Sequence, residues 1–266
     1  MEKKLILILG GARSGTETLL LHLHSIYPNH LLLGEGLNLH WNNPDGLDRN
    51  YKICTNPESE AIVKIIPLTT SSYDAYGNIP GRGETSSMNP QFAALPLTMK
   101  MLPPGERKWP LSDQAQKYLM SLQFADRTPT FNPQDTTDKV CNIANAADQI
   151  YYTTRNSLFD QAKSIYTAIH TGEFSQHSET DKRYDIIIDP KKVESCAKML
   201  FEDWKILEQL YNMYPGEVVR LESRNNPYSF NKPNNGRYTY IGTWPSLNNI
   251  VLEWEKWKLT SNLFQS

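Results

Sequence analysis

The strongest structural signal in this chain is the stretch "LILILGGARSGTETLLLHL", residues 5–23. It opens with an unbroken aliphatic run from Leu5 to Leu9, which is typical of a strand buried on both faces of a parallel sheet. Two glycines end this run, and the leucines after them recur at helical spacing until Pro28. A short aliphatic segment, Leu31–Leu33, then ends at Gly34. This order of strand, loop, helix and strand predicts an α/β fold.

Regular patterns return in the second half of the chain. We expect strands over 149–155 and 217–222, helices over 156–170 and 247–259, and a polar loop over 231–244. Asp189 and Pro190 predict the start of another long helix, because Asp is a good N-cap and Pro fits the first turn. We interpret residues 1–266 as a single α/β domain with a parallel sheet.

The stretch 42–137 has weaker patterns and is rich in Pro, Gly, Ser, Thr and Asn. Two apolar runs predict short strands at 61–67 and 97–104, and a capped helix is expected at 112–123. Long coil within a compact domain is more often functional than not. We therefore interpret 42–137 as insertions with a functional role, with a linker as the alternative.

Composition argues against several classes of function. The chain has 266 residues and a formal net charge of −2, without the basic excess of a general nucleic-acid binder. Its three cysteines lie far apart and form no CxxC pair, which argues against a disulfide framework or a zinc site. The apolar run at the N-terminus is too short for a signal peptide or a membrane span. We therefore expect a soluble, cytoplasmic protein with no nucleic-acid partner.

The glycines at positions 10 and 15 have the spacing of the phosphate loop G-x-x-x-x-G-K-[ST]. However, Thr16 stands in the lysine position, and Glu17 stands where the magnesium-binding hydroxyl is expected. The backbone N–H groups of residues 14–18, at a helix start, would still favour an anion, and Arg13 would add a positive charge. The loop thus favours a phosphate or sulfate ester without a magnesium-bound triphosphate. A glycine turn that only permits tight packing is the alternative.

The segment "RSGTETL" resembles the 5′-phosphosulfate loop, [KR]-S-G-[ST]-[ST]-x-L, of sulfotransferases that use 3′-phosphoadenosine 5′-phosphosulfate (PAPS). Glu17 departs from this pattern, and Thr18 is expected to supply the hydroxyl instead. The segment "YYTTRNSLFDQAKS" is similar to the family's 3′-phosphate site, with Arg155 and Ser164 in the roles of its arginine and serine. Bacterial carbohydrate sulfotransferases of the "RRDKxxQAxS" type share this spacing. Alternatively, Arg155 pairs with Asp160, and Ser164 is an ordinary helix residue.

Two further segments extend the resemblance. "LLLGEGLN" is similar to the "GEPLN" segment of carbohydrate sulfotransferases. The segments "IDPKKV" and "DWKILEQLYNMYPGEVVRLES" together are similar to the "DP...W......YEDL" block of the same enzymes.

The resemblance implies a single P-loop-like domain over 1–266, in which helices flank a central parallel sheet, with the acceptor pocket in the insertions of 42–137. It also implies transfer of a sulfuryl group from PAPS to a hydroxyl or amine of a sugar, lipid head group or small metabolite. Adenosine 3′,5′-bisphosphate is the other product, and no metal is needed. The absence of a recognisable signal or membrane span in the sequence favours a bacterial or viral cytoplasmic enzyme. A P-loop small-molecule kinase and an inactive nucleotide-binding module are the alternatives.

Sulfuryl transfer also needs a base and a further cation. Glu35 follows an apolar strand and matches the glutamate of "GEPL", so it is expected to take the acceptor's proton, with His40 as the alternative. Lys64 and Lys100 compete for the role of the family's strand-end lysine, and chain order favours Lys100, unless each only faces solvent from its strand. The predicted catalytic residues are Glu35, Lys100 and His40, and the predicted cofactor contacts are Arg13, Ser14, Gly15, Thr16, Glu17, Thr18, Arg155, Ser164 and Arg237.

Overall fold

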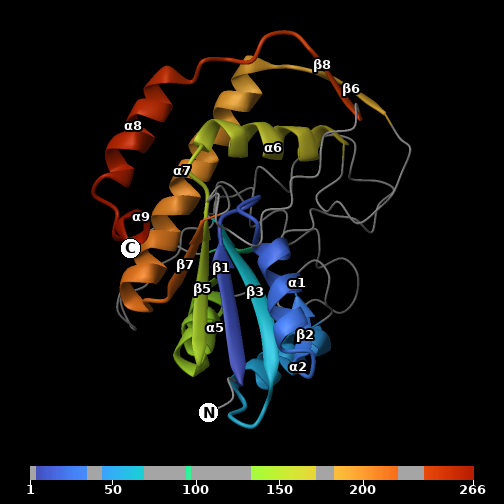
Figure 1. Ribbon diagram of the computed structural model, residues 1–266, viewed down its shortest axis with the longest axis vertical. Coiled ribbons are helices and arrows are strands. Elements are labelled where there is room, and N and C mark those ends of the chain that lie inside the picture. Colours follow the sequence, from blue (N-terminus) through green and yellow to red (C-terminus); the bar gives the residue numbers. More distant parts are fainter. Residues whose placement is uncertain (1–3, 35–43, 69–93, 97–132, 172–182, 221–236) are drawn as a thin grey trace.

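The computed structural model of this chain describes residues 4–34, 44–68, 94–96, 133–171, 183–220 and 237–266. Its centre is a parallel sheet with the strand order β2-β3-β1-β5-β7, and helices lie on both sides of it (Figure 1). The strands of the sheet are β1 (Leu5–Gly10), β2 (Leu31–Gly34), β3 (Ala61–Leu68), β5 (Gln149–Thr154) and β7 (Glu217–Arg220), and β4 (Ala94–Pro96) pairs with the end of β3. The predicted α/β fold, with helices flanking a central parallel sheet, is confirmed.

Two cores bury the aliphatic run of β1 from opposite faces. Ile6 and Ile8 pack with the three buried leucines of α1 (Thr16–Ile26), Leu19, Leu20 and Leu23, on one face. Leu7 and Leu9 belong to the larger core on the other face, to which three long helices contribute many buried residues. These helices are α5 (Pro133–Ala146), α6 (Leu158–Thr171) and α7 (Pro190–Met213). Successive side chains of a strand point to opposite faces, so a run that is apolar throughout fits only a sheet that is covered on both.

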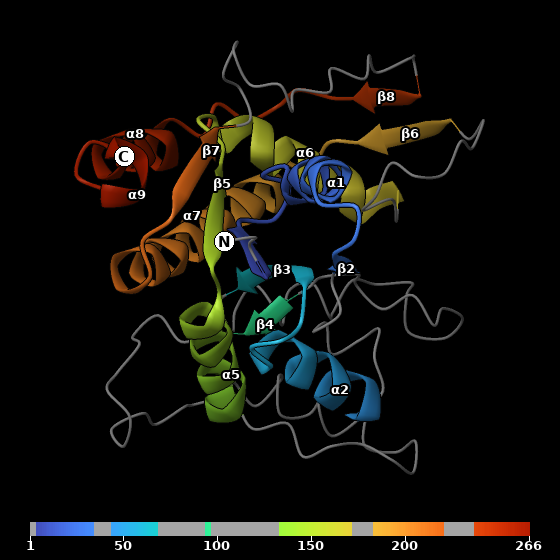
Figure 2. The ribbon, with the colours of Figure 1, turned by 60° about the horizontal axis from the view of Figure 1, so that its bottom comes forward.

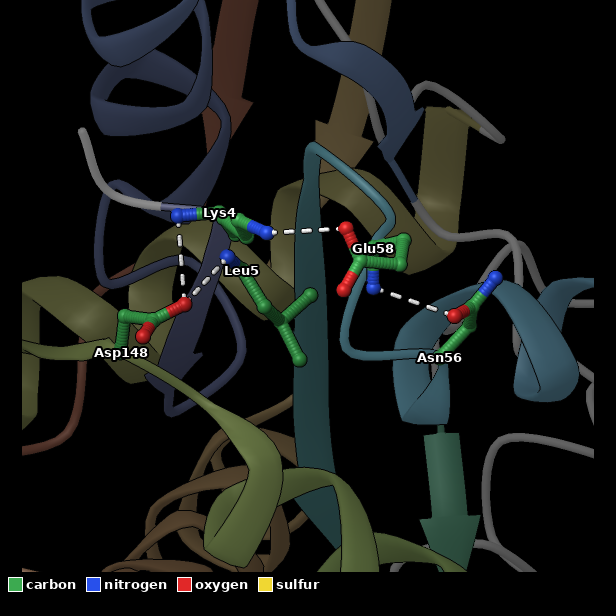
Figure 3. Close-up of polar contacts among 5 residues, drawn as sticks. All are labelled: Lys4, Leu5, Asn56, Glu58 and Asp148. Carbon is green, nitrogen blue, oxygen red and sulfur yellow. Dashed lines mark hydrogen bonds and ion pairs between the residues drawn. The ribbon is translucent and has the colours of Figure 1, made fainter. Parts of the chain in front are cut away.

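The start of β1 is tied to the turns that precede its two neighbouring strands (Figure 3). Before β5, an Asp148 Oδ atom accepts hydrogen bonds from the Leu5 N–H (2.9 Å) and the Lys4 N–H (3.1 Å). Before β3, the Lys4 ammonium lies 3.2 Å from a Glu58 carboxylate oxygen, and the Glu58 N–H donates to the Asn56 side chain. The three strands therefore start in register, and Gly10 lies opposite Thr153 at the edge where the glycine-rich loop begins.

The stretch 42–137 contributes more to the fold than the sequence suggests. Its described part contains α2 (Pro44–Thr55), the start of α5, and β3, which lies between β2 and β1. The strand expected at 61–67 is therefore present, and β3 is an inner strand of the sheet, so this part of 42–137 belongs to the central fold. That the stretch carries an acceptor pocket stays a prediction. The strand expected at 97–104 and the helix expected at 112–123 lie outside the described residues.

A second, smaller sheet in the C-terminal half of the chain was not expected from the sequence. The polar loop predicted over 231–244 contains strand β8 (Tyr238–Ile241), which pairs in parallel with β6 (Tyr184–Ile187). Figure 2 shows these two strands beside α6 and apart from the central sheet. Two short helices, α8 (Asn248–Lys258) and α9 (Asn262–Gln265), end the described chain. A strand of four residues whose partner is more than fifty residues away leaves only a weak local signal.

Candidate functional site

The loop after β1 begins with a glycine that the packing requires. A Cβ atom at Gly10 would collide with the Thr153 hydroxyl of β5 and would also crowd Thr16 and Ser14. Ser14 and Thr153 share a buried hydrogen bond of 2.6 Å, so the loop is fastened to the neighbouring strand directly beside this glycine. The glycine turn thus permits tight packing, which is the role that the alternative interpretation gives it. It also fixes the position of the loop residues that follow.

Two residues of the loop have left-handed backbone conformations. Gly15, with φ 94°, is the N-cap residue of α1, and Arg13 has φ 63°. Glycine adopts this region easily, whereas a long side chain such as arginine rarely does and is strained there. The loop leads directly into α1, whose first-turn N–H groups form a partial positive charge. Such a helix start next to an arginine is well suited to bind an anion.

The Arg13 side chain joins two motifs that the sequence keeps far apart. Its Nε atom donates a 2.9 Å hydrogen bond to the Ser164 hydroxyl of α6, and Arg155 Nη1, just after β5, donates to the Arg13 carbonyl (3.2 Å). Burial and then the charge of Arg155 lower the pKa of the Arg13 guanidinium, while Tyr238 of β8 acts in the opposite direction. Two guanidinium groups held this close repel each other, and an anion bound beside them would offset this repulsion.

Arg13, Arg155 and Ser164 are therefore brought together, as expected. Ser164 faces the loop and accepts a hydrogen bond from Arg13, and its contact with a 3′-phosphate stays a prediction. Arg237 lies directly before β8, its carbonyl accepts the Tyr184 N–H (2.9 Å), and its guanidinium lies 6.0 Å from the Tyr238 ring centre. Since Tyr238 influences Arg13, this segment borders the same cluster.

Glu17, the residue that departs from both phosphate-loop patterns, has a partner on the neighbouring strand. Its carboxylate, in the first turn of α1, forms an ion pair with the ammonium of Lys64. Lys64 lies opposite Ile8 of β1 and is only 5% exposed, so the alternative that it faces solvent is wrong. The lysine ammonium offsets the negative charge that Glu17 would otherwise bring to the start of α1.

The predicted catalytic residues Glu35, His40 and Lys100 lie outside the described residues, so their roles stay predictions. Glu35 directly follows β2, which runs parallel to β3 and β1. Within the described ranges, no group of three or more His, Cys, Asp or Glu side chains could hold a metal ion. No helix in those ranges is long and apolar enough to cross a membrane.

Sequence reasoning assigned no role to two buried side chains that contact the loop. Gln161 of α6 donates to the Ala12 carbonyl, and Trp204 of α7 donates to Gln161. The available signal was a glutamine in the apolar stripe of α6, among Leu158, Ala162 and Ile165. A polar residue at such a position is buried and needs a partner.

Comparison with protein-family models, curated proteins and solved structures finds no match for this chain.

Proposed function

We propose that this protein is a PAPS-dependent sulfotransferase that transfers a sulfuryl group to a hydroxyl or amine of a sugar, lipid head group or small metabolite. The observation that carries the proposal is the 2.9 Å hydrogen bond from Arg13 Nε to Ser164 Oγ. It joins the segment that resembles a 5′-phosphosulfate loop to the segment that resembles a 3′-phosphate site, 151 residues later. Arg155, which belongs to the second segment, also donates to the loop.

The charges of the loop favour this reaction over phosphoryl transfer from a magnesium-bound triphosphate. A P-loop kinase depends on a lysine and a magnesium-binding hydroxyl in the loop, and Thr16 and Glu17 stand in these two positions. Glu17 forms an ion pair with Lys64, so it does not add an uncompensated negative charge beside the bound anion. The loop is then an anion site built from backbone N–H groups and arginine.

In the proposed reaction, the acceptor oxygen forms a bond to sulfur while the bond between sulfur and the bridging phosphate oxygen breaks. Glu35 takes the acceptor's proton, and Arg13 with the N–H groups at the start of α1 stabilises the charge that develops on the departing phosphate. Arg155 and Ser164 hold the 3′-phosphate, so the leaving nucleotide is adenosine 3′,5′-bisphosphate. Positioning and charge stabilisation supply most of the rate acceleration in transfers of this kind.

Calorimetric titration tests the proposal directly. Adenosine 3′,5′-bisphosphate is expected to bind more tightly than adenosine 5′-monophosphate, ATP or GTP, because only the bisphosphate fills both parts of the site. Transfer of labelled sulfate from PAPS to a panel of sugars, lipids and metabolites then identifies the acceptor. Preferential binding of magnesium-ATP would instead indicate a kinase. An inactive nucleotide-binding module would bind the bisphosphate tightly but would transfer no sulfate from PAPS, either to an acceptor or slowly to water.

Replacement of Arg155 with alanine is expected to remove the preference for the 3′-phosphate. The loss should be about 1.5–3 kcal/mol for adenosine 3′,5′-bisphosphate, the range for a hydrogen bond to a charged group, and much smaller for adenosine 5′-monophosphate. Arg220→Ala is a matched control, because Arg220 ends the neighbouring strand β7 and donates to the carbonyls of Phe264 and Ser266. Equal losses for both nucleotides in Arg155→Ala would contradict the assignment.

A further inference from the structure

A buried chain of hydrogen bonds connects the core to the backbone of the glycine-rich loop that follows β1. The Trp204 indole N–H donates to Gln161 Oε1 (2.8 Å), and Gln161 Nε2 donates to the Ala12 carbonyl (2.6 Å). Both side chains are 0% exposed. A buried amide is stable only when its polar groups are paired, and here both the donor and the acceptor side of Gln161 have a partner. The pairing extends from α7 through α6 to the residue before Arg13.

The loop backbone lies directly against these two side chains. A Cβ atom at Gly11 would lie 3.1 Å from the Trp204 ring and 3.3 Å from Gln161 Nε2. Either distance is tighter than most side chains tolerate, so position 11 suits glycine. The absence of a side chain at Gly11 lets the Ala12 carbonyl come within hydrogen-bond distance of Gln161.

This contact holds the peptide group just before the strained residue. The Ala12 carbonyl belongs to the peptide plane that enters Arg13, so a fixed direction of this carbonyl restrains the Arg13 φ of 63°. Ser164 lies three residues after Gln161 on α6, on the same side of the helix, and accepts from Arg13 Nε. Helix α6 therefore holds Arg13 twice, through its preceding carbonyl and through its side chain.

We propose that Gln161 and Trp204 are positioning residues that hold Arg13 in its anion-binding conformation. The proposal rests on the proposed function for the identity of the nucleotide. The Arg13 backbone is then already ordered in the folded protein before the ligand binds. Binding therefore does not have to supply the free energy of this ordering, and the affinity is higher. Gln161 acts through Arg13, and it makes no contact with the ligand itself.

A double-mutant cycle with adenosine 3′,5′-bisphosphate tests this role. Gln161→Met keeps the length of the side chain and removes both hydrogen bonds, and it is expected to weaken binding about tenfold or more. In an Arg13→Ala background the same change should cost less than about threefold, because the residue that it positions is gone. A role in general stability would instead give equal losses in both backgrounds. Additive losses, or unchanged affinity in Gln161→Met, would overturn the proposal.

A gentler pair of variants covers the case in which Gln161→Met does not fold. Trp204→Phe removes the donor to Gln161, and Trp257→Phe is its control, since the Trp257 indole N–H donates to Glu208 (2.9 Å) away from the loop. Only Trp204→Phe should lower nucleotide affinity, although both should lower the melting temperature. Equal affinities in the two variants would overturn the proposal.

Titration of the wild-type protein with inorganic phosphate separates this inference from the proposed function. Wild-type protein that binds phosphate but no adenosine bisphosphate would overturn the assigned nucleotide, and the same cycle with phosphate would then decide the positioning role. Wild-type protein that binds neither would overturn both.

Discussion

Replacement of Glu35 with glutamine is expected to lower kcat by about 10²- to 10⁴-fold, the usual contribution of a general base. Glutamine keeps the size of the side chain and much of its hydrogen bonding, but it cannot accept the acceptor's proton. Affinity for adenosine 3′,5′-bisphosphate should remain unchanged, since the nucleotide is assigned to the loop after β1 and to the segment after β5. Steady-state turnover with the identified acceptor, together with calorimetry, measures the two quantities separately.

His40→Asn is the companion variant for this prediction. If Glu35→Gln retains near-normal turnover and His40→Asn does not, the role of base moves to His40. If both variants remain active on the true acceptor, no side chain of this segment is the base. A parallel loss of affinity and kcat in Glu35→Gln would indicate that Glu35 supports the nucleotide site instead.

Replacement of Lys64 with methionine is expected to weaken binding of adenosine 3′,5′-bisphosphate by about 10- to 100-fold. Methionine replaces the apolar stem of lysine but has no charge, so the Glu17 carboxylate then lacks its Lys64 partner and repels the phosphate nearby. Adding Glu17→Gln should restore most of the affinity, because the side chains at positions 17 and 64 then again carry no net charge. Calorimetry on wild type, both single variants and the double variant gives the coupling energy directly.

Lys4→Met provides the matched control for Lys64→Met. Lys4 also pairs with a glutamate, but this pair is exposed and lies at the opposite end of β1, so its loss should leave nucleotide affinity unchanged. If the Lys64→Met and Glu17→Gln double variant binds as weakly as Lys64→Met, charge compensation of Glu17 is not the role of Lys64.

The same variants address the choice between the two lysines. Lys100→Met is expected to lose kcat with little change in affinity, as chain order favours Lys100 for the catalytic role. A double variant of Lys64 and Glu17 that regains affinity but not turnover would assign that role to Lys64. Normal turnover in Lys100→Met and in the double variant would remove the catalytic lysine from the proposal.

Local patterns in the chain are sufficient for the elements around the loop. A strand that is covered on both faces needs a continuous aliphatic run, and β1 has one. The burial of β1 can therefore be predicted from this run alone. The start of α7 is equally readable, because Asp189 accepts the N–H groups of Lys191 and Lys192 as an N-cap does. The roles expected for Arg155 and Ser164, in contrast, depend on the resemblance of their segment to the sulfotransferase 3′-phosphate site, whereas Arg13 lies in a loop whose glycine spacing is itself a signal.

Pairings between distant segments have no such local signature. The apolar run at 61–67 indicates a strand, but it does not indicate that this strand lies between β2 and β1. Strand order depends on which surfaces pack against each other. Lys64 resembles any strand lysine until β3 lies beside the loop and brings it to Glu17. Gln161 likewise gains its partners only when α6, α7 and the loop meet. Periodicity specifies which face of an element is buried, whereas the buried polar contacts of this site depend on the packing of elements that are far apart in the chain.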